Sequence, residues 1–431
     1  MRIAFYEDDS ATHLGPIALL RPVFELVCGQ FSLRERLLRR FDVSEWGVFV
    51  RPELAETYHE LHPAARVNKL RWLGDGTTLL VNGRWLPAFE SLSRLSLSHN
   101  EVGLWGDQVV ALALDPDEAA LLSTHGWDMA VSQLARLRKP RTLNGTMIAR
   151  PWDLVNHNPK QLEDDFRLVG PLVGRDFGPH VAVLGPAHAI HVDPTAVIDP
   201  FVVIDARSGP VSIGPRAAIR SFTAIEGPCH VGHDSQLFRA HVRGGTTIGP
   251  VCRVGGEIEA SILHSHVNKY HTGFLGHSYI CPWVNLGALT TNSDLKNDYS
   301  AVRVPLDGEL VETGMTKVGC FIGDHTKTAL GSLFNTGTSV GVLSMVLPGG
   351  ELLPKYIPSF SSVWHGELSE GWDIERALET ARVAMSRRDC ELTPAMERLL
   401  RRVYDETDEE RRSAIEHFRD KRANRSKMPI G

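Results

Sequence analysis

An aliphatic side chain recurs at every sixth position over much of the region from about residue 192 to residue 346, and this period limits the folds open to the chain. Such a period suits neither an isolated helix nor an alternating strand. It suits short strands wound into coils of three hexads, in which each inward aliphatic packs on its equivalents above and below. The sequence therefore predicts a parallel β-helix from about residue 181 to 350. The residues expected inside it are Val192, Ile198, Ile204, Ile213, Ile219, Ile225, Val231, Leu237, Ile248, Val254, Phe274, Ile280, Leu286, Ile322, Thr328, Phe334, Val340 and Val346.

The chain on either side of the repeats has a different pattern of apolar and charged residues. Before them, short apolar runs typical of buried strands alternate with amphipathic runs typical of helices, which favours a mostly parallel sheet flanked by helices. The strands are expected at 2–6, 47–50, 78–81 and 109–114, and the helices at 32–41, 116–125 and 128–138. After the repeats, a charged tail predicts helices at 372–389 and 394–421. We therefore predict an α/β domain at 1–165, a β-helix at 171–355 and a helical tail at 366–431. The regular repeats of the β-helix are expected to end near Pro348, and an irregular loop at 293–317 is expected to interrupt them.

Charge and cysteine content exclude several classes of partner. Hydrophobic residues make up 42% and charged residues 23% of the chain, and the net charge of −6 gives no reason to expect nucleic acid or an anionic membrane. The six cysteines include no Cys-x-x-Cys pair, and no apolar run approaches membrane-spanning length. Acidic residues follow the first strand where a signal peptide would need an apolar stretch. We expect a cytoplasmic protein with small-molecule substrates.

The densest polar segment lies between residues 262 and 299, inside the repeats. Here the aliphatic pattern weakens while histidine, lysine, asparagine and aspartate accumulate. A β-helix does not need these residues for stability, so their presence on a rigid scaffold indicates a functional site. The polar residues are His264, His266, Lys269, His271, His277, Asn285, Asn292, Asp294 and Lys296.

Two motifs in this segment resemble a known enzyme site. The sequences Lys269-Tyr-His-Thr-Gly-Phe-Leu-Gly276 and Val284-Asn-Leu-Gly-Ala288 resemble, in order and spacing, the acetyltransferase site of the bifunctional enzymes that acetylate glucosamine 1-phosphate and then uridylylate the product to UDP-N-acetylglucosamine. The resemblance implies a left-handed β-helix, a homotrimer with sites at subunit boundaries, and acetyl-CoA as the acetyl donor. It makes His271 the general base and Asn285 a contact of the amino sugar.

The remaining site residues are expectations of the same kind. Phe274 stands where the family has a sugar-binding tyrosine, and Glu259 where it has a phosphate-binding lysine. Arg239, Arg243 or Lys269 is then left to hold the phosphate of the acceptor. The acetyl-CoA path is expected along Ala288, Asn292, Lys317 and Lys327. The chemistry suits a histidine, because imidazole, with an ordinary pKa of about 6.5, accepts a proton well near neutral pH.

The first 165 residues resemble sugar nucleotidyltransferases more faintly. Those enzymes follow their first strand with a glycine-rich loop and a lysine that neutralise phosphates, and they bind Mg²⁺ through an aspartate. This chain has a single glycine in that loop, Val23 at the lysine position and Arg84 at the aspartate position. Arg21, Asn82 and Arg84 remain as weak candidates for nucleotide binding, and a role for Mg²⁺ stays open.

The sequence thus predicts an acetyl-CoA-dependent N-acetyltransferase acting on an amino-sugar phosphate, such as glucosamine 1-phosphate, fused to a degenerate sugar-1-phosphate nucleotidyltransferase domain. Three alternatives stay open. The first is an active bifunctional enzyme, and the second is a non-catalytic scaffold that binds a sugar nucleotide. The third is a zinc lyase of the β-helical carbonic anhydrase type, which would draw three imidazole ligands from His264, His266, His271 and His277; the favoured reading assigns no metal ligand.

Overall fold

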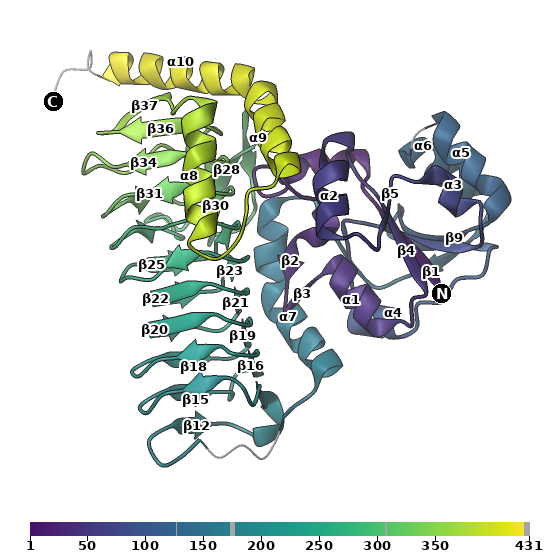
Figure 1. Ribbon diagram of the computed structural model, residues 1–431, viewed down its shortest axis with the longest axis horizontal. Coiled ribbons are helices and arrows are strands. Elements are labelled where there is room, and N and C mark those ends of the chain that lie inside the picture. Colours follow the sequence, from purple (N-terminus) through teal and green to yellow (C-terminus); the bar gives the residue numbers. More distant parts are fainter. Residues whose placement is uncertain (126, 173–176, 307, 426–431) are drawn as a thin grey trace. The chain divides into compact units, whose positions relative to one another are not determined.

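The computed structural model describes residues 1–125, 127–172, 177–306 and 308–425, and the chain divides into two compact units. The first unit comprises Met1–Leu14, Leu20–Val27 and Phe31–Asp153. The second comprises Gly15–Leu19, Cys28–Gln30 and the chain from Leu154 onward. Figure 1 shows the helices and strands of both units.

The first unit is built on a seven-stranded sheet with the order β10-β8-β9-β6-β1-β4-β5. All neighbours are parallel except β9, which runs antiparallel to both β6 and β8. The predicted strands and the mostly parallel sheet are confirmed, whereas the β8–β9 hairpin and the short strands β5 and β10 were not predicted. The strands are β1 (Arg2–Tyr6), β4 (Glu45–Phe49), β5 (Arg66–Val67), β6 (Thr78–Asn82), β8 (Glu101–Trp105), β9 (Gln108–Leu114) and β10 (Lys139–Thr142).

Helices flank this sheet, three of them at the predicted positions 32–41, 116–125 and 128–138 and three others that were not predicted. Helix α1 begins after Ser32, whose hydroxyl accepts from the backbone N–H of Glu35 at 3.3 Å while the Glu35 carboxylate accepts from the backbone N–H of Ser32 at 3.2 Å. This capping box fixes the first turn of the helix, which was predicted from its amphipathic pattern. The helices are α1 (Leu33–Arg40), α2 (Ala55–Leu61), α3 (Leu70–Leu73), α4 (Phe89–Ser93), α5 (Ala119–His125) and α6 (Trp127–Arg136), and a small ribbon pairs β7 (Trp85–Pro87) with β11 (Gly145–Met147).

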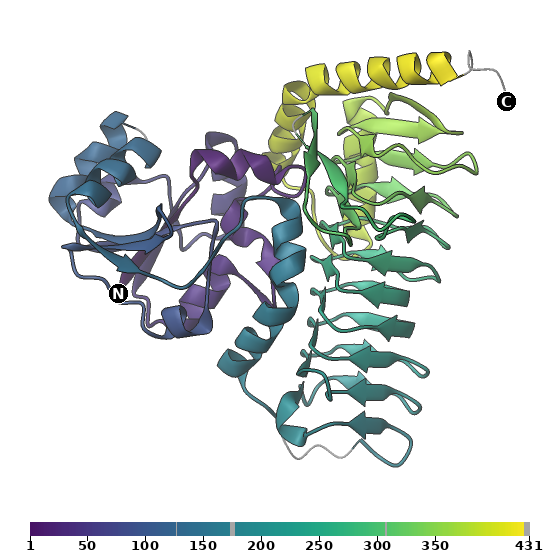
Figure 2. The same cartoon turned by 180° about the vertical axis from the view of Figure 1, so that it is seen from behind.

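The second unit is a left-handed parallel β-helix whose coils stack into three faces (Figures 1 and 2). The first face holds β12 (Ala182–Leu184), β15 (Val203–Asp205), β18 (Ala224–Glu226), the second halves of β20 (Gln236–Val242) and β22 (Arg253–Glu259), β25 (Phe274–Gly276), β27 (Thr291–Asn292) and β32 (Leu333–Phe334). The second face holds β13 (Ile190–Val192), β16 (Val211–Ile213), β19 (Cys229–Val231), β21 (Thr246–Ile248), β23 (Ile262–Leu263), β26 (Tyr279–Ile280), β30 (Cys320–Ile322), β33 (Thr338–Val340) and β35 (Tyr356–Ile357). The third face holds β14 (Val197–Ile198), β17 (Ala218–Ile219), the first halves of β20 and β22, β24 (Asn268–Lys269), β31 (Lys327–Thr328), β34 (Met345–Leu347) and β36 (Ser361–Trp364).

The hexad aliphatics form the core of this β-helix, as predicted. Ile219, for example, is fully buried and stacks between Ile198 and Leu237. Ile198, in the first coil of its face, is half-buried. The prediction for Phe274 is wrong: Leu275 takes the inward position opposite Ile258, and Phe274 is only half-buried. The reason is that the corner from the first to the second face is one residue shorter at this level, which shifts the phase of the repeat.

Two predicted boundaries also differ from the structure. The segment at 293–317 is not irregular throughout, because it carries a hairpin of β28 (Arg303–Leu306) and β29 (Glu309–Glu312), whose inner side chains include the buried Val304 and Leu306. The β-helix continues beyond Pro348 through β35 and β36, and β37 (Glu367–Glu370) then pairs antiparallel with β36.

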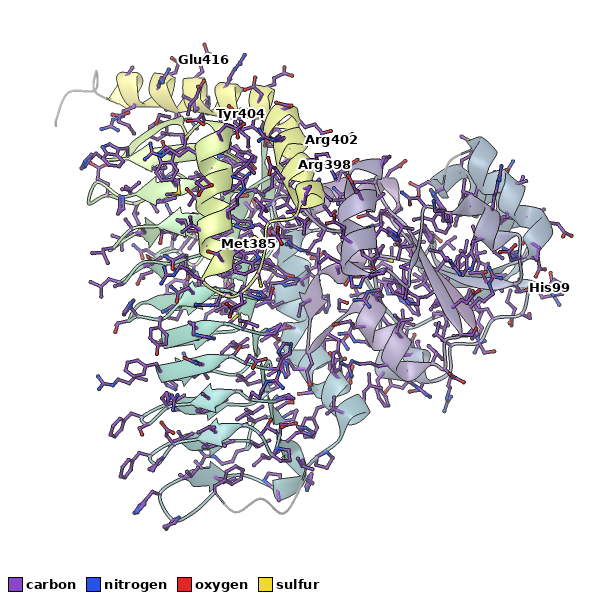
Figure 3. The ribbon with its side chains drawn as sticks, in the orientation of Figure 1. His99, Met385, Arg398, Arg402, Tyr404 and Glu416 are labelled. Atoms are coloured by element: carbon purple, nitrogen blue, oxygen red, sulfur yellow. The ribbon has the colours of Figure 1, made fainter. Side chains whose placement is uncertain are left out.

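Helices complete the second unit. Helix α7 (Pro151–Val169) is held against the coils by Asn158, whose side-chain amide donates to the carbonyl of Gly245 at 2.8 Å. The tail forms three helices rather than two: α8 (Ile374–Ser386), α9 (Pro394–Glu406) and α10 (Asp408–Arg425). Ile415 and Phe418 of α10 pack on the last coils, while Glu416 stays exposed (Figure 3). Among the described helices, none is both long enough and apolar enough to cross a membrane.

Candidate active site at two corners of the β-helix

Lys269 has a different role from the predicted phosphate contact. Its side chain occupies an inward position opposite Val254 and is 2% exposed. Its Nζ donates to the carbonyls of Gly255 at 2.7 Å, Gly273 at 2.8 Å and His271 at 3.1 Å. Burial lowers the pKa of Lys269 to about 8. Because all three donors are used, Lys269 shapes the loop that carries His271 and does not present its charge to a ligand.

We therefore expect Lys269→Met to lower the free energy of unfolding by about 3 kcal/mol, since the substitution leaves three buried carbonyls without their donor. Urea unfolding of the wild type and the variant measures this difference. Lys317→Met is the matched control, because Lys317 is 45% exposed and makes one ion pair, so its loss should cost below about 1 kcal/mol. Equal losses in the two variants would contradict the structural role of Lys269.

His271 lies on the corner between the third and first faces. We call this corner, formed by Phe238, Arg239, Tyr270 and His271, the His271 corner. The rings of Phe238 and Tyr270 stack at 5.4 Å, the Arg239 guanidinium lies 5.3 Å from the Phe238 ring, and His271 meets Tyr270 edge-on at 5.9 Å. His271 is exposed, and no hydrogen bond of its ring occurs within the described part of the chain. The structure thus brings the predicted His271 and Arg239 into one exposed cluster.

A second polar cluster occupies the corner between the first and second faces. This His277 corner is formed by Arg243, Glu259, His277, Asp294 and Lys317. Nδ1 of His277 lies 2.8 Å from Oδ2 of Asp294. Glu259 accepts from Arg243 at 2.6 Å and pairs with Lys317 at 3.5 Å. Backbone bonds fix the geometry, because His277 N–H donates to the carbonyl of Glu259 at 3.0 Å.

The protonation of this corner follows from its contacts. Burial raises the pKa of Asp294, but the hydrogen bond from His277 and the positive charges of His277 and Lys317 outweigh burial and hold the pKa below its ordinary value. Asp294 is therefore a carboxylate at neutral pH and can only accept a hydrogen bond. It follows that Nδ1 of His277 donates to Asp294, which leaves Nε2 as the ring nitrogen that this contact does not use.

Gly276 positions Phe274 and Asp294 beside one another. A Cβ atom at Gly276 would lie 2.5 Å from Oδ2 of Asp294 and 2.5 Å from Cζ of Phe274, so no side chain fits there. The predicted acetyl-CoA contact Asn292 is 2% exposed and used for structure. Its side-chain oxygen accepts from Gly276 N–H at 2.9 Å, and its amide donates to the Gly276 carbonyl at 3.0 Å. The side chain of Asn292 thus makes, with the backbone of Gly276, the two hydrogen bonds that a neighbouring strand would otherwise make.

The other predicted residues lie outside the two corners or next to them. Asn285 sits on the third face between Asn268 and Lys327, and its side chain accepts from the amide of Asn268. Lys327 donates to the carbonyl of Trp283, and burial lowers its pKa to about 8. Ala288 is half-buried in the turn that follows Asn285. The Lys327 amine is thus engaged by a backbone carbonyl.

His277 and Asp294 were placed in the polar segment from the sequence and Glu259 was noted, but it was not predicted that these three residues lie at one corner. A signal was present, because residues separated by about one coil, 17 or 18 positions, stack on one another, as positions 259, 277 and 294 do. The zinc alternative is not supported. His266 stacks on Trp283 at 4.1 Å, and within the described ranges no three histidine, cysteine, aspartate or glutamate side chains gather as a metal site.

In the first unit, the expected nucleotide site is filled by protein contacts. The Arg84 guanidinium donates to both carboxylate oxygens of Asp8 at 2.6 Å and to the carbonyl of Ile148 at 2.9 Å. Asn82 also donates to Asp8, at 2.8 Å. Burial and the charges of Asp8 and Asp9 raise the pKa of Asp128 to about 6, although Asp9 N–H donates to it.

The segments that would neutralise phosphates are also altered. A 3₁₀ helix, Asp9–Leu14, takes the place of the glycine-rich loop after β1, and Val23 is buried. The backbone carbonyl of Arg21, the other weak candidate, accepts from Arg51 at 3.0 Å. This part of the sheet therefore has carboxylates where a triphosphate would need cations.

Parts of the chain are similar to known proteins. Residues 3–170 match the family model described as sugar nucleotidyl transferase. A bifunctional sugar-1-phosphate nucleotidylyltransferase/acetyltransferase of Sulfurisphaera tokodaii is 31% identical over 93 residues, 22% of this chain and 23% of that protein. The bifunctional protein GlmU of Synechococcus elongatus is 25% identical over 221 residues, 46% of this chain and 44% of that protein.

One solved structure is similar to part of the chain. The UDP-N-acetylglucosamine acyltransferase of Arabidopsis has 14% identity and a TM-score of 0.26, and the match covers 51% of this chain and 80% of that one. The chain spans less than half the length of the two curated relatives described above. Its residues 3–170 match the sugar nucleotidyl transferase model, and parts of the chain are similar to bifunctional nucleotidylyltransferase/acetyltransferases.

Proposed function

We propose that the β-helix transfers an acetyl group from acetyl-CoA to the amino group of a sugar phosphate, such as glucosamine 1-phosphate. The observation that carries this proposal is the interruption of the hexads by two imidazoles, those of His271 and His277, on neighbouring corners of one coil. The names of the curated relatives support the reaction class. An amino group must lose a proton before or as it attacks a thioester, so a histidine is the residue that this reaction needs.

The charges of the His277 corner suit such an acceptor. Arg243 is 43% exposed and Lys317 is 45% exposed, so both cations can turn toward a phosphate. Glu259, 19% exposed between them, can accept from a sugar ammonium or hydroxyl. Two histidines are candidates for the proton acceptor: His271, which the resemblance implies, and His277, which the carboxylate of Asp294 orients. Arg239 is the cation available at the His271 corner.

We further propose that the protein is a homotrimer that works in the cytoplasm. Exposed aromatic side chains on the corner between the third and first faces support an assembly: Phe201 is 56% and Phe222 is 68% exposed, and their rings stack at 5.7 Å. Apolar groups of this size are commonly covered by a partner. Sedimentation equilibrium measures the state, and a stable monomer that turns over at the full rate would refute the trimer.

The function is tested by incubating the purified protein with acetyl-CoA and a panel of amines and following release of free CoA. We expect turnover with glucosamine 1-phosphate and at least tenfold lower kcat/KM with glucosamine, because the unphosphorylated sugar lacks the partner of Arg243 and Lys317. In Arg243→Ala this preference for the phosphate should shrink through a higher KM. Absence of CoA release with every amine would refute the proposed acetyl transfer.

For the nucleotidyltransferase-like domain we expect little or no pyrophosphate release from UTP and N-acetylglucosamine 1-phosphate in the presence of Mg²⁺. Nucleotidyl transfer depends on neutralising phosphate charge, and the Arg84 guanidinium is engaged by Asp8 while Val23 supplies no charge. The same assay on Arg21→Ala is the control. Robust wild-type turnover that this variant abolishes would show an active domain in which Arg21 carries the phosphates.

A further inference from the structure

We infer that Arg253 and Arg388 hold the phosphates of acetyl-CoA, so that the helical tail supplies part of the donor site on the third face. This inference rests on the proposed acetyl transfer and deepens it by naming the residues that hold the donor. The nucleotide end of acetyl-CoA carries a pyrophosphate and a ribose phosphate. Of the lysines expected to meet them, Lys327 donates to a backbone carbonyl, and Lys317 belongs to the His277 corner proposed for the acceptor. The donor phosphates therefore need other cations.

Arg253 presents an oriented guanidinium on the third face. It begins β22, pairs in register with Asn268 of the next coil, and is half-buried. Its Nη1 donates to the backbone carbonyls of Asp234 at 3.0 Å, Cys252 at 3.0 Å and Val251 at 3.4 Å. Within the described part of the chain, Nε and Nη2 make no hydrogen bond. The carbonyls thus fix the plane of the guanidinium and leave the edge whose two donors bind a pair of phosphate oxygens.

Arg388 is presented by the turn that ends helix α8. The backbone N–H groups of Arg388 and Cys390 donate to the carbonyl of Met385 at 2.9 and 3.1 Å, and Asp389 adopts a left-handed φ of 56°. Such bonds to the last carbonyls close a helix in a compact turn. Figure 1 shows the lower end of α8, where Figure 3 labels Met385, at the level of β25. Because β25 pairs with β22, the tail brings Arg388 to the coils that carry Arg253.

The two arginines lie close together without a carboxylate that pairs with either. Burial and the charge of Arg388 lower the pKa of Arg253, so the two guanidinium groups repel each other. Burial and neighbouring positive charges, with Arg388 the largest of them, lower the pKa of His266 to about 4. Neither arginine makes an ion pair with any residue that the structure describes, and Asp234 is already paired with Arg216 at 2.7 Å. A bound anion would relieve this repulsion.

The third face connects the two arginines with the residues proposed for acetyl transfer. Arg253 pairs in register with Asn268, and Asn268 with Asn285, the proposed contact of the amino sugar. These three residues therefore lie on successive rungs, which are about 4.8 Å apart. His271 follows Asn268 after two intervening residues, about 10 Å along the strand direction. A pantetheine arm that runs along this face from Arg253 therefore brings the thioester to the His271 corner and leaves His271 as the base that the resemblance implies.

The surroundings of the arginines suit the nucleotide end of the donor better than the acceptor. The rings of His266 and Trp283 stack at 4.1 Å on the adjoining corner, between the second and third faces. Aromatic rings beside arginines suit a nucleotide, because bases stack on such rings while guanidinium groups bind the phosphates. The acceptor phosphate has its own cations, Arg243 and Lys317, at the His277 corner. Donor and acceptor phosphates are thus held at different corners.

The test measures binding of coenzyme A by calorimetry, and the kinetics of CoA release, with the full-length variants Arg388→Ala, Arg253→Ala and Arg387→Ala. Arg387 is the matched control, because it precedes Arg388 in the same turn and is exposed. We expect the first two variants to raise the Kd of coenzyme A and the KM for acetyl-CoA by about 10- to 100-fold, the effect of losing charge-assisted hydrogen bonds. Their KM for glucosamine 1-phosphate should stay within about twofold of the wild type, and Arg387→Ala should match it throughout.

Shorter ligands identify the group that the arginines hold. Adenosine 3′,5′-bisphosphate has phosphates but no pantetheine arm, so its affinity should fall in both variants, whereas that of pantetheine should not change. Arg253→Lys keeps the charge without the paired donors and should bind with intermediate affinity; it replaces Arg253→Ala if circular dichroism shows that variant to be unfolded.

Three outcomes would overturn the inference. In an enzyme that acetylates, unchanged binding of coenzyme A by Arg388→Ala and by the folded Arg253 variant overturns it alone. So does a higher KM for glucosamine 1-phosphate at an unchanged Kd of coenzyme A, which would assign the arginines to the acceptor. A wild type that binds no coenzyme A and acetylates no amine overturns the proposed function and the inference together.

Discussion

Replacing Ile219 with aspartate is expected to prevent the β-helix from folding. Ile219 is fully buried between Ile198 and Leu237 in a core of aliphatic side chains. A carboxylate there would meet neither a cation nor a donor, and an unpaired buried charge costs several kcal/mol, which exceeds what one substitution usually removes. Circular dichroism and size-exclusion chromatography of the purified variant should show loss of the strand signal and aggregation.

The matched control for this experiment is Val197→Asp. Val197 lies on the third face next to Ile198, pairs in register with Ala218 and is 51% exposed. We expect this variant to fold and to change the free energy of unfolding by no more than about 0.5 kcal/mol. A folded Ile219→Asp, or equal damage by both substitutions, would contradict the assignment of inward and outward positions.

The second large effect is expected in the first unit, at the ion pair of Arg84 and Asp8. Their side chains are 6% and 10% exposed, and two bonds of 2.6 Å join them. Arg84→Ala leaves the carboxylate of Asp8 buried with Asn82 as its described side-chain donor, which should cost about 3 to 5 kcal/mol. Urea unfolding followed by tryptophan fluorescence measures it, because most tryptophans belong to the first unit.

Arg66→Ala provides the comparison for Arg84. Arg66 also pairs with a carboxylate in the first unit, that of Glu45, but at 3.5 Å and with both side chains well exposed. Exposed pairs contribute little, so this variant should unfold almost as the wild type does. If Arg84→Ala were no less stable than Arg66→Ala, the Asp8 pair would not be a structural contact, and Arg84 would again be available to a nucleotide.

The β-helix was visible in the sequence because its rule is local and repeated. Each coil needs an aliphatic side chain at the same inward position, so the period alone identifies positions such as Ile213 and Val231. The rule also explains one failure. Lys269 falls at an inward position opposite Val254, which already implied a buried ammonium, yet its charge suggested a ligand contact. A lysine in the core is recognisable only once the register of the coil is known.

The pairing of His277 with Asp294 was harder to predict. The two residues are one coil apart, and the corner that carries His277 is one residue shorter than the hexads require, so counting by six does not align them. In the first unit, the β8–β9 hairpin was missed because its turn at Gly106 joins strands whose apolar content is uneven. Contacts that depend on an irregular corner or a short turn are set by three-dimensional packing, and a one-dimensional period does not contain them.

Helix α10 has a consequence for solubility. Every coil of a parallel β-helix presents free N–H and carbonyl groups to the next coil, so an uncovered last coil is a template on which another chain can add. Ile415 and Phe418 cover the apolar interior at that level, and β37, antiparallel to β36, occupies the neighbouring strand edge. The tail thus works as a terminator of strand addition, and without it the same stacking that builds the domain would favour end-to-end fibres.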